Sequence, residues 1–201
     1  MNSTREHILI TSLTLFSQKS FKEVTMKDIV DQTGLSKGAF YHYFNSKEQV
    51  FAEVIQHFFV GMLTTDYSRL SKTSLKDFYQ EILTEEQNSR QEFQNLLSGQ
   101  KNTIFHNNYY YLLFDAMRML PQFKEYHLQQ QRAELIAWKN VLDIAIKNKE
   151  IKSTMTSTQL AKLFINLSDG VNINMIMGDN TNHEKTELQE LWDALYNSLK
   201  L

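Results

Sequence analysis

Residues 25–47 read TMKDIVDQTGLSKGAFYHYFNSK, and this stretch decides the fold of the first part of the chain. Thr25 is a good N-cap and Asp28 follows three residues later, so a helix is expected to begin here. Gly34 suits the left-handed position that ends a helix, and Ser36 can cap a second, shorter helix. The pattern therefore predicts two helices joined by a tight turn.

Two helices joined in this way are typical of the helix-turn-helix, whose second helix lies in the major groove of DNA. The side chains expected to bury the pair against an earlier helix are Ile29, Val30, Leu35, Phe40 and Phe44. On the outer face, small side chains permit a close approach to DNA, while lysine, tyrosine and histidine can donate to phosphate oxygens. The predicted DNA-contacting residues are Thr25, Ser36, Lys37, Gly38, Ala39, Tyr41, His42, Tyr43 and Lys47.

When the residues are considered alone, this stretch also allows interpretations that do not involve DNA binding. The two helices could be ordinary surface helices joined by a turn. Tyr43, and less readily Tyr41, could belong to the core, and His42 could be a plain surface residue.

Between residues 15 and 51 the chain resembles the TetR (tetracycline-repressor) family of regulators. The most specific part is GLSKGAFYHYF at residues 34–44, followed by Ser-Lys-Glu at residues 46–48. Ser20 stands where the family usually has Gly, and Thr33 stands where Ala is common. Neither residue faces DNA in this interpretation, so neither departure puts DNA binding in doubt.

The resemblance implies more than these residues show. Proteins of this family are homodimers that bind palindromic operators in double-stranded DNA, usually as repressors. They release the DNA when a small-molecule effector enters the C-terminal domain. Their dimer contact is usually a four-helix bundle, built from the last two long helices of each subunit.

Length and composition fit an all-α protein. The 201 residues include one Pro and six Gly, and so few helix breakers favour long helices. We expect a helix-turn-helix DNA-binding domain of three helices over residues 1–46. A helical regulatory and dimerisation domain is expected over residues 47–201, and its first helix is the connector. The expected helices span 4–19, 25–33, 37–44, 47–70, 75–97, 103–120, 122–149, 157–178 and 184–200.

Aromatic and methionine residues concentrate between Phe105 and Tyr126 and suggest a pocket for a lipophilic effector. Its walls would be the three helices expected between residues 75 and 149. The alternative is ordinary core packing, because consecutive tyrosines of one helix must point in different directions. The candidate ligand-binding residues are Phe105, Tyr109, Tyr110, Phe114, Met117, Tyr126 and Trp138.

The last two expected helices each carry an apolar stripe at helical spacing, which predicts that they close a four-helix bundle with a second copy. The alternative is that both stripes pack within the subunit. The candidate interface residues are Leu160, Phe164, Leu167, Val171, Leu188, Trp192 and Leu195.

Several function classes are disfavoured. Cysteine is absent, which excludes disulfides and thiolate metal sites. No apolar stretch approaches the ~20 residues that cross a bilayer, so we expect no membrane contact and a cytoplasmic location. No nucleophile motif, phosphate loop or metal-ligand spacing appears, so we expect no enzyme, no cofactor and no metal.

The alternative to a DNA-binding regulator is a helical adaptor that binds only protein. The net charge of −2 argues weakly against nucleic-acid binding. DNA binding must therefore come from where the charges lie rather than from their number.

Overall fold

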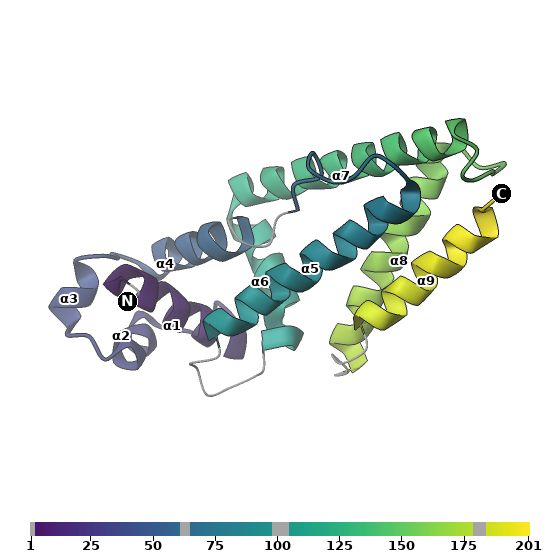
Figure 1. Cartoon of the computed structure of the whole chain (residues 1–201). Helices are drawn as coiled ribbons and strands as arrows, with labels where there is room; N and C mark the ends of the chain where they lie inside the picture. The colour runs from purple at the N-terminus through teal and green to yellow at the C-terminus, as the bar shows by residue number, and fades with distance from the viewer. Residues whose placement is uncertain (1–2, 61–64, 98–104, 179–183) are drawn as a thin grey trace. The chain divides into compact units, whose positions relative to one another are not determined.

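The computed structural model describes residues 3–60, 65–97, 105–178 and 184–201 (Figure 1). Within these ranges the chain is helical, and an isolated bridge between Ile151 and Lys200 is the only strand-like pairing. The fold is all-α, as predicted. The helices are α1 (Thr4–Gln18), α2 (Met26–Thr33), α3 (Lys37–Tyr41), α4 (Lys47–Val54), a π-helical segment (Ile55–Val60), α5 (Leu75–Leu97), α6 (Phe105–Met119), α7 (Pro121–Lys147), α8 (Ser157–Gly178) and α9 (Glu184–Leu199).

Side-chain caps explain why the first helices begin and end where they do. Thr25 accepts from the Asp28 N–H while the Asp28 carboxylate accepts from the Thr25 N–H, which completes a capping box. Gly34 ends α2 with φ 68°, a conformation that costs glycine little. The side chains of Ser36 and Ser46 cap α3 and α4 by accepting from the N–H groups of Ala39 and Gln49.

Two predicted boundaries were wrong. A single helix was expected from residue 47 to about residue 70, but α4 gives way to a π-helical turn at Ile55 and residues 65–70 are not helical. Apolar residues every four positions are compatible with both α and π geometry, so the spacing did not reveal the change. α3 ends at Tyr41 rather than near residue 44.

Pro121 lies at the boundary between two helices. α6 ends at Met119, before Pro121, and Pro121 is the first residue of α7. Proline fits this position because the first N–H of a helix has no partner within the helix and the ring presets φ.

Contacts divide the chain into two compact units. Unit 1 lies within residues 1–64 and 90–126, and unit 2 lies within residues 65–89 and 127–201. α4 and α6 both pack on α1 and belong with it to unit 1.

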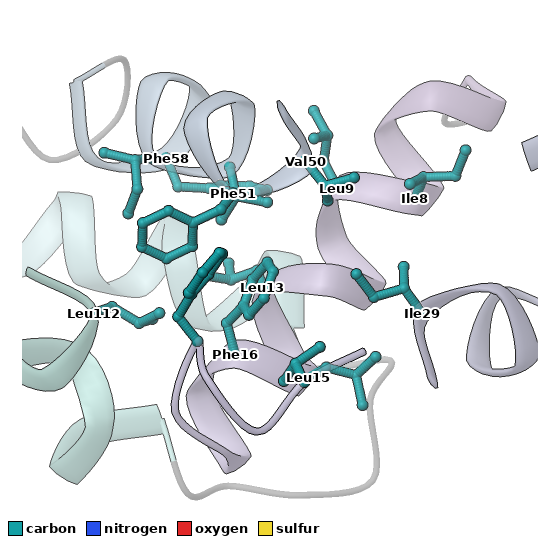
Figure 2. Packing of buried hydrophobic residues seen from close by; sticks show 14 of the residues in the cluster. Ile8, Leu9, Leu13, Leu15, Phe16, Ile29, Val50, Phe51, Phe58 and Leu112 are labelled. Atoms are coloured by element: carbon teal, nitrogen blue, oxygen red, sulfur yellow. The ribbon is translucent and has the colours of Figure 1, made fainter. Parts of the chain in front are cut away.

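The core of unit 1 is aromatic and joins α1 to α4 and α6. Figure 2 shows Leu13 and Phe16 of α1 facing Phe51, Phe58 and Leu112. The ring of Phe16 meets that of Phe51 edge-on with centroids 5.2 Å apart. Such edge-to-face pairs add to the stabilisation that burial supplies. The helix-turn-helix therefore rests on the same core as the first turns of α4.

The core of unit 2 is built around two buried tryptophans. Trp138 stacks on Phe164 with centroids 4.7 Å apart and meets Trp192 edge-on at 5.2 Å. The indole N–H of Trp192 donates to the backbone carbonyl of Phe164 at 2.9 Å, which satisfies its polar group inside the core. α7, α8 and α9 thus meet at these rings.

One acidic side chain lies beside this aromatic core. Burial, with a smaller contribution from the carboxylates of Asp169 and Glu86, raises the pKa of Glu134 to about 7. Hydrogen bonds from Tyr67 and Trp138 oppose this rise in the pKa. Unit 2 therefore holds a carboxyl group that titrates near neutrality.

Glu134 makes stability depend on pH in a definite direction. The folded protein binds this proton more tightly than the unfolded chain, so the free energy of unfolding falls as pH rises from 4.5 to about 7. At about 1.4 kcal/mol per pH unit, the loss reaches about 3 kcal/mol and then levels off. Glu134→Gln should remove most of this dependence, as measured by urea unfolding between pH 5 and pH 8.

The matched control is Glu190→Gln, which changes an exposed carboxylate of α9. It should keep the wild-type dependence on pH. If the free energy of unfolding depended on pH in the same way in wild type and in Glu134→Gln, Glu134 would not titrate in this range.

Candidate nucleic-acid interface

The inner face of the helix-turn-helix packs into the core of unit 1. Ile29 of α2, Phe40 of α3 and Phe44 after it have no exposed surface, and Val30 and Leu35 pack against the same core. Because the apolar residues take the inner side, the remaining residues of α3 are turned to solvent. This burial pattern is the one the sequence predicted.

The predicted contact residues of α3 share one exposed surface. Tyr41 is 38% exposed, and Tyr43 is exposed to a similar degree, so neither belongs to the core. The Lys37 ammonium lies 5.9 Å from the centroid of the Tyr41 ring. The other exposed residues of this surface are Gly38, Ala39 and His42.

Gly38, near the start of α3, has no side chain that would project from this exposed surface. A Cβ atom added at Gly38 would meet no other atom within 4 Å. The protein's own packing therefore does not require glycine here. The missing side chain leaves room for a molecule that approaches from outside.

Two of the predicted DNA-contacting residues, Thr25 and Ser36, use their hydroxyl groups to cap helices. The Thr25 hydroxyl donates to the Asp28 carboxylate at 2.7 Å and accepts from the Asp28 N–H. These hydrogen bonds lower the pKa of Asp28, so its carboxylate is negative at neutral pH. The Ser36 hydroxyl accepts from the Ala39 N–H at 3.2 Å. Both hydroxyls set the directions of α2 and α3.

Lys47, also a predicted phosphate contact, has a structural task. Its ammonium donates to the backbone carbonyls of Phe21 and Val24 at 2.8 and 2.6 Å and lies 4.3 Å from the Phe21 ring centroid. Two of its three N–H bonds are thus used to hold the α1–α2 loop against the start of α4. One N–H is left to donate to a phosphate.

Lys47→Met should lower the free energy of unfolding by about 1–3 kcal/mol, because it removes hydrogen bonds from a charged donor to two carbonyls. Urea unfolding followed by circular dichroism measures the change. Lys22→Met, which alters an exposed residue of the same loop, should change stability by less than about 0.5 kcal/mol. Equal stability of the two variants would refute the structural role of Lys47.

A further contact between α1 and α4 was not predicted. Arg5 of α1 forms an ion pair with Glu53 of α4, and its guanidinium lies 5.8 Å from the Phe44 ring centroid. Together with Lys47, this pair connects both ends of α4 to α1 and to the loop that follows it. The partners are too far apart in sequence for any local pattern to reveal them.

The candidate ligand-binding residues whose side chains the structure describes differ in burial and in the unit to which they belong. Phe114 is 61% exposed, whereas Met117 and Tyr126 pack partly buried in unit 1. Trp138 is fully buried in the core of unit 2, where rings surround it. The side chains of Phe105, Tyr109 and Tyr110 lie outside the described part of the structure.

The candidate interface residues lie mostly inside unit 2. Packing within the subunit, the alternative left open by the sequence, accounts for the buried members: Leu160, Phe164, Val171, Leu188 and Trp192. Leu167 and Leu195 are partly buried against the same core. Other residues of the same two helices are exposed and apolar, namely Leu163, Ile173 and Leu191.

Two further features concern the described residues alone. They contain no group of three side chains placed to hold a metal ion. None of their helices combines the length and apolar character that a membrane crossing requires.

Comparison with known proteins links the exposed α3 surface to a family. Residues 8–54 match the family described as "Bacterial regulatory proteins, tetR family". The transcriptional regulator YerO of Bacillus subtilis is 40% identical over 62 residues, and the transcriptional repressor KstR2 of Mycolicibacterium smegmatis is 39% identical over 56 residues. These matches cover 31% and 28% of this chain but only 21% and 27% of the relatives' length.

Two longer similarities extend over nearly the whole chain. The transcriptional regulator YfiR of Bacillus subtilis is 26% identical over 197 residues, which covers 93% of this chain and 90% of YfiR. The solved structure of the ketosteroid transcriptional regulator KstR2 of Mycobacterium tuberculosis superposes with a TM-score of 0.67 at 16% identity, covering 100% of this chain and 97% of that one. The similarity in structure concerns the fold.

Proposed function

Because the chain belongs to the TetR family of bacterial regulatory proteins, we propose that it is a transcriptional repressor that binds a palindromic DNA operator as a homodimer. Members of this family are DNA-binding transcriptional regulators and not enzymes. The repressor would act in the cytoplasm, and a small molecule would release it from DNA.

The exposed surface of α3 is the observation that carries this proposal. Lys37, Tyr41 and Tyr43 are turned to solvent around the small residues at 38 and 39, while the apolar side of α3 is buried. Donors on a short helix that is free on one side can reach phosphate oxygens and base edges in a major groove.

A titration with fluorescein-labelled duplex DNA over a salt series tests this function. Wild-type protein should bind, and its affinity should fall steeply as salt rises, because lysines displace counterions from phosphates. Tyr41→Ala should weaken binding to all sequences alike, and Lys37→Met should also reduce the salt slope by about one. Binding that is weak and independent of salt would favour the adaptor that binds only protein.

For the homodimer, the support is the exposed apolar side of the last two helices. Leu163 and Ile173 of α8 and Leu191 of α9 are turned to solvent although they are large and apolar. Covering such residues with the same residues of a second copy gives a self-complementary two-fold contact. We infer that these side chains, with the partly buried Leu167 and Leu195, form the contact.

A further inference from the structure

One end of unit 2 carries four exposed lysines, which we call the lysine patch: Lys147, Lys149, Lys152 and Lys200. The first three lie at the end of α7 and in the loop before α8. Figure 1 shows the C-terminus beside this loop, and the bridge between Ile151 and Lys200 joins the two segments. The Lys152 N–H donates to the Leu199 carbonyl at 2.8 Å, so backbone hydrogen bonds hold the lysines of the loop and of the chain end together.

Few acidic groups offset these charges. Residues 144–168 include one acidic residue, Glu150. Its carboxylate accepts from the Leu75 N–H at 3.1 Å, so its charge is directed to the start of α5. Asp143, just before this range, pairs with Lys139. Among the residues that the structure describes, no lysine of the patch forms an ion pair. The patch is therefore locally positive, although the whole chain has a net charge of −2.

Lys149 occupies a position that favours glycine. Its N–H donates to the Ile146 carbonyl and the Glu150 N–H donates to the Ala145 carbonyl, an arrangement that ends many helices. The φ angle of Lys149 is 58°, and no other residue but glycine has a positive φ in the described part of the chain. Glycine adopts this conformation without strain, so a lysine here has a conformational cost. That cost leaves a positive charge in the patch.

The phosphates of duplex DNA are the partner that fits these charges. An ammonium group is a compact point charge that binds phosphate without a fixed geometry, and DNA presents phosphates at regular intervals along both strands. An anionic membrane fits less well, because a helix end, a loop and a chain end do not form an amphipathic helix that enters lipid. Of the large apolar residues in these segments, Ile146 and Met155 are 37% and 36% exposed, and only Leu201 is mostly exposed.

We propose that the lysine patch is a second DNA-contacting surface, which binds duplex phosphates without regard to sequence. It belongs to unit 2, whereas α3 belongs to unit 1, so the two surfaces use different residues. The patch adds non-specific affinity for DNA to the sequence-selective contact proposed for α3. Because it does not depend on an operator sequence, each of the two contacts can be tested without the other.

The patch can be tested in a protein whose α3 contacts are removed. Lys37→Met with Tyr41→Ala provides this background, and a fluorescein-labelled duplex of arbitrary sequence is the probe. The background protein should still bind at about 50 mM salt, since non-specific binding is electrostatic. Adding Lys147→Gln, Lys149→Gly and Lys152→Gln should weaken binding by about tenfold or more and reduce the salt slope by about three, which is close to one for each phosphate contact.

A matched control removes the same number of charges elsewhere. Lys124→Gln, Lys139→Gln and Lys162→Gln change three exposed lysines outside the patch, and together they should weaken binding by about twofold at most. Lys149→Gly alone should reduce the salt slope by about one without lowering the urea midpoint of unfolding, because glycine suits the conformation at this position. Weaker binding in this variant would therefore not be due to loss of the fold.

Three results would overturn the second surface. Equal weakening by the patch and control substitutions would show that only the total charge matters. Unchanged binding in the patch variant would show that these lysines do not contact DNA. Vesicles of phosphatidylglycerol and phosphatidylcholine test the other polyanionic surface, and binding to them that depends on the patch, without such binding to DNA, would assign the patch to a membrane. The repressor function is tested separately, because a patch variant with intact α3 should still distinguish an operator from other duplexes.

Discussion

Replacing Leu191 of α9 by Arg is expected to convert the proposed dimer into a folded monomer. Leu191 is 37% exposed in the subunit, so an Arg side chain can extend into water and the monomer should keep its stability. In a two-fold contact the substitution would bury two guanidinium groups close together without partners, which costs several kcal/mol per charge. Leu163→Arg on α8 should act in the same way.

Loss of the dimer should have a large effect on operator binding. A dimer holds two recognition helices on one DNA molecule, and such linkage raises the apparent affinity by roughly 10²–10⁴ over a single helix-turn-helix. Sedimentation at micromolar concentration and a DNA titration would measure both effects. Ile146→Arg on α7 is the matched control, because Ile146 is also 37% exposed. A dimer that persists in both Leu163→Arg and Leu191→Arg would exclude this face as the contact.

Trp138→Ala is expected to lower the free energy of unfolding by about 3–5 kcal/mol, the usual cost of truncating a large buried aromatic side chain. Trp138 has no exposed surface and lies within 5.2 Å, between ring centroids, of Phe78, Phe164 and Trp192. The substitution would leave a cavity that these rings cannot fill without giving up their own contacts.

Urea unfolding at pH 8 measures this loss, and Phe114→Ala is the control. Phe114 is an aromatic residue from the same list of ligand-binding candidates, but it is exposed, so its truncation should change stability by less than about 0.5 kcal/mol. If Trp138 were part of the wall of an open pocket instead of a core residue, both variants would lose a similar, small amount of the free energy of unfolding.

Local signals in the sequence predicted the DNA-binding part well. The capping box of Thr25 and Asp28, the left-handed Gly34 and the cap at Ser36 each depend on neighbours within a few residues. The bounds of α5 and α8 were also predicted, since breakers flank both helices. Predictions of this kind succeed because they depend on interactions between residues that are close in sequence.

Features that depend on distant residues could not be predicted. Lys47 was expected to face a phosphate, and only the folded chain brings its ammonium to the carbonyls of Phe21 and Val24. An apolar stripe on α8 indicates that one face of the helix is covered, but it does not indicate which residues cover that face. Phe164 is covered by Trp138 and Trp192 of the same subunit, whereas Leu163, its neighbour, is exposed.

A cavity within unit 1 is lined by residues from segments 52–60 and 120–126, and the first of these segments was expected to be plain α-helix. The aromatic cluster that suggested a pocket contributes Tyr126 and Phe123 to it, whereas Trp138 belongs to a separate core.

Selection of binding sites from a pool of random duplex DNA tests the repressor function most directly. Wild-type protein should enrich an inverted repeat whose half-sites lie about one helical turn, ~34–36 Å, apart, because a two-fold dimer presents two copies of α3 to successive major grooves. Tyr41→Ala should enrich the same repeat less efficiently. Rounds of selection that enrich no common sequence, or only a single half-site without a repeat, would contradict a dimeric DNA-binding repressor.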